Sequence, residues 1–149
     1  MTTKQTIDAF LANPAIAVVG ASRLGHKFGN AACRVLVAKG YRVYPIHRHV
    51  SQIDVMACYP RFVDLPEKVD AVLIVVPPWE ALDVIGQAAA AGIHYVWLQQ
   101  GAESAEAVKL AAKLGLTLIS GECVLMYAKP SGVHLAHRFI RRITGSLPA

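Results

Sequence analysis

The chain has 149 residues, of which 54% are hydrophobic and 17% charged, with a formal net charge of +5 and a pI near 9.3. A chain of this length can bury a core without disulfide support, so we expect one domain over residues 1–149. The three cysteines are widely spaced and exclude a disulfide framework or a zinc-finger pattern. The positive charge favours an anionic partner without identifying it.

The N-terminal segment predicts a short amphipathic helix around residues 7–11. It lacks the apolar centre and small-residue cleavage site of a signal peptide. No apolar run in the sequence approaches the roughly 20 residues that a membrane-spanning helix needs. We therefore expect a cytoplasmic protein.

Five short apolar runs rich in β-branched residues predict buried strands. They are Ile16–Val19, Tyr41–Ile46, Ala71–Val76, Tyr95–Leu98 and Leu116–Ile119. Alanine-rich segments of helical length precede three of them and end at Gly40, Gly92 and Gly115, as helices that close on a glycine do. This alternation predicts an α/β fold, a three-layer doubly wound (Rossmann-like) sandwich with about five parallel strands and a C-terminal helix.

A glycine-punctuated loop follows the first predicted strand and leads into a helical pattern. The loop has the spacing Gly20-x-Ser22-x-x-Gly25 and continues to Gly29. Glycines after a strand let the backbone approach a ligand, and the next helix offers N–H groups to an anion. Serine replaces the second glycine of the dinucleotide fingerprint, which argues against an ordinary NAD site.

The second predicted strand ends in His47-Arg48-His49, where an NAD site would place an acidic residue for the ribose hydroxyls. Basic side chains there suit a ribose that carries an additional phosphate. Two cofactors fit, NADP with its 2′-phosphate and coenzyme A with its 3′-phosphate. The alternative is a loop whose basic side chains are only solvated.

The middle of the chain, residues 50–68, predicts a connection with little regular structure and at most one helical turn. Pro78 is well placed as the first residue of the helix after the third strand. Ser104 is a candidate N-cap for the helix that runs to Leu114.

The loops after the predicted strands meet at one edge of a doubly wound sheet, where ligands bind. Together they resemble the coenzyme A-binding domain that occurs as a small stand-alone family and as the N-terminal domain of the succinyl-coenzyme A synthetase alpha subunit. The resemblance covers about residues 10–130 and rests on several short motifs in order. These are Val19-Gly20-Ala21-Ser22, Lys27-Phe28-Gly29-Asn30, Tyr44-Pro45-Ile46-His47-Arg48, Cys58-Tyr59-Pro60, Val75-Val76-Pro77-Pro78, Trp97-Leu98-Gln99-Gln100-Gly101 and Cys123.

The resemblance implies that the first loop contacts the pyrophosphate and that the end of the second strand meets the 3′-phosphate. Relatives often end that strand in Val-Asn-Pro and a lysine, so whether His47 or Arg48 reads the phosphate stays open. Val76 and Pro77 would flank the adenosine or the start of the pantetheine arm. The predicted cofactor-binding residues are Gly20, Ala21, Ser22, Arg23, Lys27, Phe28, Gly29, Asn30, Ile46, His47, Arg48, Val76, Pro77, Gln99, Gln100 and Gly101.

The leading hypothesis is a module that binds coenzyme A or an acyl-coenzyme A as a carrier, sensor or regulator, without catalytic residues or a metal site. One alternative is an NADP-dependent oxidoreductase or NADP sensor. Another is a basic module that uses a predicted helix over residues 134–143 to contact nucleic acid or an acidic protein, although no interleaved aromatic pattern supports nucleic acid. A protein partner or a homo-oligomer stays open. Cys123, near the ligand edge, fits a small buried hydrophobe better than a thiol that forms a mixed disulfide with the coenzyme.

Overall fold

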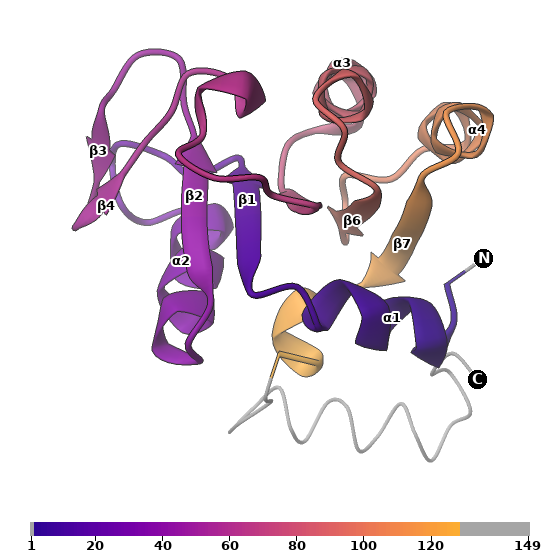
Figure 1. Ribbon diagram of the computed structural model, residues 1–149, viewed down its shortest axis with the longest axis horizontal. Helices are drawn as coiled ribbons and strands as arrows, with labels where there is room; N and C mark the ends of the chain where they lie inside the picture. Colours follow the sequence, from indigo (N-terminus) through magenta and orange to yellow (C-terminus); the bar gives the residue numbers. More distant parts are fainter. Residues whose placement is uncertain (1, 129–149) are drawn as a thin grey trace.

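The computed structural model describes residues 2–128 and contains a parallel five-stranded sheet in the order β2-β1-β5-β6-β7. Figure 1 shows this sheet between two layers of helices. The strands are β1 (Ala15–Val19), β2 (Arg42–Ile46), β5 (Ala71–Ile74), β6 (Tyr95–Gln99) and β7 (Thr117–Glu122). The predicted Rossmann-like α/β fold and its parallel strands are therefore confirmed, and no strand end differs from its predicted position by more than three residues.

Helices cover both faces of the sheet. They are α1 (Lys4–Leu11), α2 (Phe28–Ala38), α3 (Pro78–Ala90) and α4 (Ala105–Lys113). Helices α1 and α2 lie on one face, and α3 and α4 lie on the other (Figure 1). Successive side chains of a strand point to opposite faces of the sheet. In β5, Leu73 packs in the core beneath α1 and α2, whereas Val72 and Ile74 pack beneath α3 and α4.

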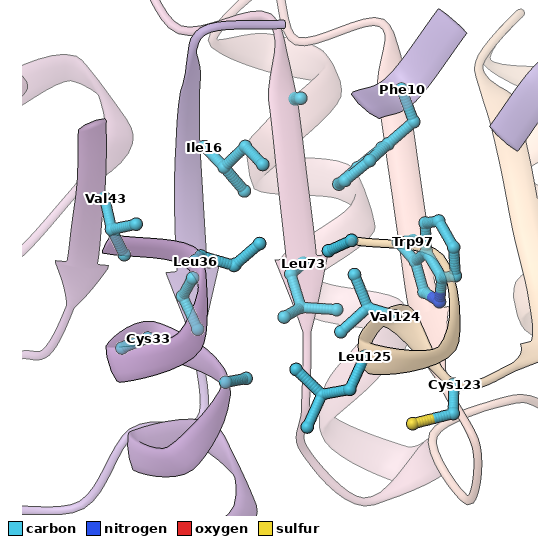
Figure 2. Close-up of a cluster of buried hydrophobic side chains, with 14 of the residues drawn as sticks. Phe10, Ile16, Cys33, Leu36, Val43, Leu73, Trp97, Cys123, Val124 and Leu125 are labelled. Carbon is cyan, nitrogen blue, oxygen red and sulfur yellow. The ribbon is translucent and has the colours of Figure 1, made fainter. Parts of the chain in front are cut away.

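Trp97 of β6 belongs to the core beneath α1 and α2, and Figure 2 shows it beside Phe10 and Val124. It has no exposed surface, and its ring meets Phe10 of α1 edge to face with the ring centroids 5.2 Å apart. The indole Nε1–H donates a hydrogen bond to the carbonyl oxygen of Glu122, at 3.0 Å. Satisfying this polar atom lets a large aromatic side chain be fully buried.

All three cysteines are free and buried, which confirms the prediction that Cys123 is a small buried side chain. Cys33 and Cys123 belong to the core cluster in Figure 2. Burial raises the pKa of Cys33 to about 12, and burial also raises the pKa of Cys58. These two thiols are therefore protonated at neutral pH and poorly nucleophilic.

The predicted helix signals are confirmed by the local geometry. Gly40, Gly92 and Gly115 follow their helices with φ values of +93°, +81° and +69°. Pro78 is the first residue of α3, and the Ser104 hydroxyl accepts a hydrogen bond from the Ala107 N–H at the start of α4. Local sequence thus determines where these helices begin and end.

The connection after β2 is more ordered than the sequence predicts. It contains a small hairpin of β3 (Gln52–Ile53) and β4 (Met56–Ala57), followed by a 3-10 turn, η1 (Phe62–Asp64). Tyr59 then runs beside the end of β2, because its N–H donates to Pro45 and its carbonyl oxygen accepts from His47 N–H, at 3.0 and 2.9 Å. These bonds extend the sheet at its carboxyl edge and fix the backbone of His47.

The predicted C-terminal helix over residues 134–143 lies outside the described residues. Within residues 2–128, no helix has the length and apolar character needed to cross a membrane.

Two side chains of β2 bind the carboxylate of Glu67, which leads to a prediction of how stability depends on pH. The guanidinium of Arg42 and then the hydroxyl of Tyr44 lower the pKa of Glu67 from 4.5 to about 2. A carboxyl group with a lowered folded pKa stabilises the fold above its unfolded pKa, and this contribution is lost as pH falls. We expect Glu67→Gln to have a lower free energy of unfolding than the parent protein at pH 7. The difference between the two proteins should shrink as the pH falls from 4.5 to 2, because Glu67 becomes protonated in the parent.

Urea unfolding of both proteins at a series of pH values measures this difference. A deficit that stays constant down to pH 2 would contradict the assigned ion pair.

Candidate functional site

A groove of about 550 Å³ opens at the carboxyl edge of the sheet. It lies where β1 is flanked by β2 on one side and β5 on the other, so the chain leaves β1 for α2 on one face and leaves β5 for α3 on the opposite face. This reversal of strand order is the usual ligand position in doubly wound sheets. The groove's volume lies within the range of small-molecule sites.

The base of the groove is formed by the turn that follows β1. Gly20 has a φ of +117°, and a Cβ placed there would lie 2.2 Å from the carbonyl oxygen of Val75. A Cβ on Gly29, in the first turn of α2, would lie 2.5 Å from the carbonyl oxygen of Gly20. Two glycines therefore allow α2 and the end of β5 to approach the turn closely.

A buried amide holds the rest of this turn. Asn30 has no exposed surface, its Oδ1 accepts from the Ser22 N–H at 2.9 Å, and its Nδ2 donates to the Ser22 carbonyl oxygen at 2.8 Å. This pair of bonds fixes the backbone of Ser22 on both sides. Asn30 thus acts as a positioning residue for the turn.

Further along, Arg34 of α2 holds the turn from its outer side. Its Nη2 donates to the Gly25 carbonyl oxygen at 2.8 Å, and its Nε donates to the Asp54 carboxylate at 2.9 Å. Asp54 lies in the β3–β4 hairpin, so the hairpin supports the turn through one guanidinium.

The second wall of the groove carries positive and imidazole side chains from the end of β2. His47, Arg48 and His49 all line it. Burial, followed by the nearby His49 and Arg23, lowers the pKa of His47 below its usual 6.5. His47 is therefore neutral at pH 7, and because its Nδ1 accepts from the His49 N–H at 3.1 Å, its proton lies on Nε2 as a hydrogen-bond donor.

The third wall is one face of α3, and it carries acidic side chains. Glu80, Asp83, Val84 and Gln87 line the groove at helical spacing. Nη2 of Arg48 lies 3.8 Å from Oδ2 of Asp83 across the groove, and both side chains are about 70% exposed. An exposed pair at this distance contributes little stability, so Arg48 can exchange Asp83 for another anion at small cost.

The helices that begin at this edge differ in their caps. Helices α2 and α3 have no side-chain cap, whereas the Ser104 hydroxyl caps α4 farther along the sheet. The first N–H groups of α2 have no intrahelical acceptor and carry the positive end of the helix dipole, whereas α3 begins with Pro78, which has no N–H, and carries Glu80 in its first turn. Of the two helices next to the groove, α2 is therefore the one whose start favours negative charge.

A second hollow of about 290 Å³ adjoins the groove and shares Val76 with it. It lies between the residues after β5 (Val75–Pro78) and those after β6 (Gln99–Ala102). Gln99 is buried and its Oε1 accepts from the Val124 N–H at 3.1 Å, while Gln100 Nε2 donates to the Gly121 carbonyl oxygen at 3.2 Å. The two hollows together offer a path from β2 past β5 to β6.

The part of the chain that the structure describes contains no cluster of three or more histidine, cysteine or acidic side chains able to hold a metal ion.

Comparison with known families gives a match over residues 14–129 to the CoA binding domain. The chain belongs to this family. The recognised resemblance to coenzyme A-binding domains is therefore confirmed. The family supports coenzyme A as the ligand class and gives no support to NADP.

Three proteins illustrate the range of relatives to which this chain is similar. ADP-forming acetate–CoA ligase I of Archaeoglobus fulgidus is 30% identical over 121 residues, covering 74% of this chain and 18% of the ligase. A conserved hypothetical protein from Pyrococcus furiosus matches with a TM-score of 0.70 and 37% identity, over 74% of this chain and 96% of that one. A dinucleotide-forming acetyl-coenzyme A synthetase 1 from Ca. Korarchaeum cryptofilum matches with a TM-score of 0.63 and 32% identity, over 71% of this chain and 25% of the synthetase.

The chain spans less than a fifth of the length of the curated relatives it matches. The chain therefore resembles one region of much longer proteins, and it also resembles proteins of about its own size.

The structure brings most of the predicted binding residues of this CoA binding domain to one edge. The larger groove is lined by Gly20, Ala21, Ile46, His47, Arg48 and Val76, and the second hollow by Val76, Pro77, Gln99, Gln100 and Gly101. The other predicted residues belong to the turn and the start of α2 but lie outside both linings: Ser22, Arg23, Lys27, Phe28, Gly29 and Asn30. Gly29 packs against Gly20 and Asn30 bonds to Ser22, so both support the turn after β1.

The predicted site lacks the α3 wall. Trp79, Glu80, Asp83, Val84 and Gln87 all line the groove. Their helical spacing directly after the third predicted strand was the available signal, because the first turns of such a helix adjoin the ligand edge. Pro60 and Phe62 also line the groove: Pro60 belongs to the Cys58-Tyr59-Pro60 motif of the family resemblance, whereas the sequence carries no comparable signal for Phe62.

The close approach at Gly29 gives a stability prediction. Gly29→Ala would place a methyl group 2.5 Å from backbone oxygen, and we expect the free energy of unfolding to fall by about 1 to 3 kcal/mol. The matched control is Gly86→Ala in α3, where a Cβ meets nothing within 4 Å and helix propensity should raise stability by about 0.5 to 1 kcal/mol.

Chemical denaturation of both variants tests this contrast. Equal effects of the two substitutions would show that the packing of α2 on the turn is looser than described.

Proposed function

We propose that the protein binds coenzyme A or an acyl-coenzyme A in the groove and its adjoining hollow, as a carrier, sensor or regulatory module. The observation that carries this proposal is the groove at the strand-order reversal, with a glycine turn at its base and basic side chains on the β2 wall. Family membership supplies the ligand class.

The pyrophosphate is assigned to the Gly20–Ala21 turn. The absence of a side chain at Gly20 lets an anion approach the backbone, and the uncapped start of α2 packs directly behind the turn. Arg23, whose positive charge contributes to the lowered pKa of His47, adds an exposed cation in the same loop. These features favour a doubly charged linker over a neutral ligand.

The ribose 3′-phosphate is assigned to the β2 wall. The Nε2–H of neutral His47 and the guanidinium of Arg48 both donate hydrogen bonds, and Arg48 also supplies a full charge. The present partner of Arg48 is the exposed carboxylate of Asp83 at 3.8 Å, which a phosphate dianion would displace. Arg48 is thus the main charged contact, with His47 as a directional one.

The pantetheine arm is assigned to the second hollow. From the groove it would pass Val76 and Pro77 and continue along Gln99, Gln100 and Gly101. Because the Gln99 and Gln100 side chains already bond to backbone groups, the wall they form is pre-organised. The residues beyond them would face the thiol or acyl end.

A binding role without catalysis is part of the proposal. The relatives named as ligases are several times longer than this chain, and the match covers one region of them. The buried thiols of Cys33 and Cys58 have raised pKa values, which makes them poor nucleophiles. We assign the described residues to holding the ligand.

The phosphate assignment predicts a difference between two ligands. Arg48→Gln should weaken coenzyme A about tenfold while changing dephospho-coenzyme A less than twofold, because only the former carries the 3′-phosphate. Isothermal titration calorimetry of each ligand with each protein measures both constants.

Arg42→Gln is the matched control, since it removes the same charge from the other end of β2. It should leave both affinities unchanged. Equal losses for the two ligands in Arg48→Gln would refute the phosphate contact, and no binding of coenzyme A by the parent protein would refute the proposed function.

A further inference from the structure

Trp79 is the least buried large aromatic side chain on the groove. It is the second residue of α3, lines the groove and is 74% exposed, whereas Trp97 is completely buried. These are the two tryptophans of the chain. An indole ring left in water beside a hollow is unfavourable unless something covers it, because aromatic rings contribute their stabilisation when buried.

Charge divides the groove into two halves. The β2 wall holds His47 and Arg48, and the α3 wall holds the carboxylates of Glu80 and Asp83. Phosphates are attracted by the first wall and repelled by the second, so a nucleotide must place its phosphates toward β2. Its base then lies toward α3.

The α3 wall suits a purine base. Val84 and Phe62 provide apolar contact, and the Trp79 ring offers a flat surface at the mouth. A carboxylate such as that of Asp83 only accepts hydrogen bonds, which matches the exocyclic amino group of adenine. The same acidic residues that would repel a phosphate are therefore compatible with this base.

We propose that the indole ring of Trp79 stacks on the adenine of the bound coenzyme and closes the adenosine half of the groove. This inference rests on the proposed function and adds a recognition residue to it. Stacking on adenine would bury the exposed ring and would make the base, in addition to the phosphates, a source of affinity.

Intrinsic fluorescence tests the stacking directly, because the buried Trp97 supplies a constant background. Adenosine 3′,5′-bisphosphate, which has the base and no pantetheine, should quench the Trp79 emission with a saturable dependence on concentration. 4′-Phosphopantetheine, which has the arm and no base, should leave it unchanged. In Trp79→Phe the remaining emission should not respond to either compound.

Binding of coenzyme A measured by calorimetry provides the second readout. Trp79→Ala should weaken coenzyme A about 5- to 150-fold, the range expected for loss of one base–aromatic stack, and Trp79→Phe should stay within about threefold of the parent. Val63→Ala, an exposed apolar position outside the groove lining, is the control and should not change affinity.

The outcomes separate this inference from the proposed function. If the parent protein binds coenzyme A while Trp79→Ala binds it equally well and the emission is not quenched, the stacking is overturned and the binding function stands. If calorimetry detects no binding of coenzyme A by the folded parent protein, the proposed function fails and the stacking with it.

Discussion

The close packing of three backbone segments at Gly20 is the constraint on which the site depends. The carbonyl oxygen of Val75 occupies the space that a side chain at Gly20 would need, and the carbonyl oxygen of Gly20 occupies the space that a side chain at Gly29 of α2 would need. As a result, β1, β5 and α2 converge on one small volume, and the base of the groove is made of backbone. Asn30 adds rigidity, because its side-chain amide bonds to both the backbone N–H and the carbonyl oxygen of Ser22 while Asn30 lies outside the groove lining.

Around this base, the two walls have complementary electrostatic properties. Imidazole and guanidinium groups follow β2, and carboxylates follow α3. Arg48 and Asp83 lie 3.8 Å apart across the groove and form a weak, exposed ion pair. A ligand with phosphate at one end and a neutral base at the other matches both walls, whereas an anion of uniform charge would match one. The fold thus encodes an orientation as well as a charge preference.

Sequence reasoning was most reliable where a local pattern determines the structure. β-Branched runs and the closing glycines located the strands and helix ends, and the loops at their carboxyl ends located the base of the groove and its β2 wall. Contacts between distant segments were not predicted: the pairing of Tyr59 with the end of β2 depends on how residues 47–58 turn back. The Lys27-Phe28-Gly29-Asn30 motif predicted that Asn30 belongs to the site, but its two bonds to Ser22 depend on the three-dimensional arrangement, and so does the contribution of the α3 wall.

The sequestered sulfur atoms have a practical consequence for experiments. Cys33 has no exposed surface, and Cys58 and Cys123 are only 8% and 7% exposed, so the native packing slows the reaction of all three with a maleimide dye. Covalent labelling of Cys33 would therefore require transient opening of the molecule, and the labelling rate would report how often it opens. Because Cys33 lies on the buried face of α2 while Cys123 follows β7, mass spectrometry of the labelled peptides would compare opening in two parts of the same layer.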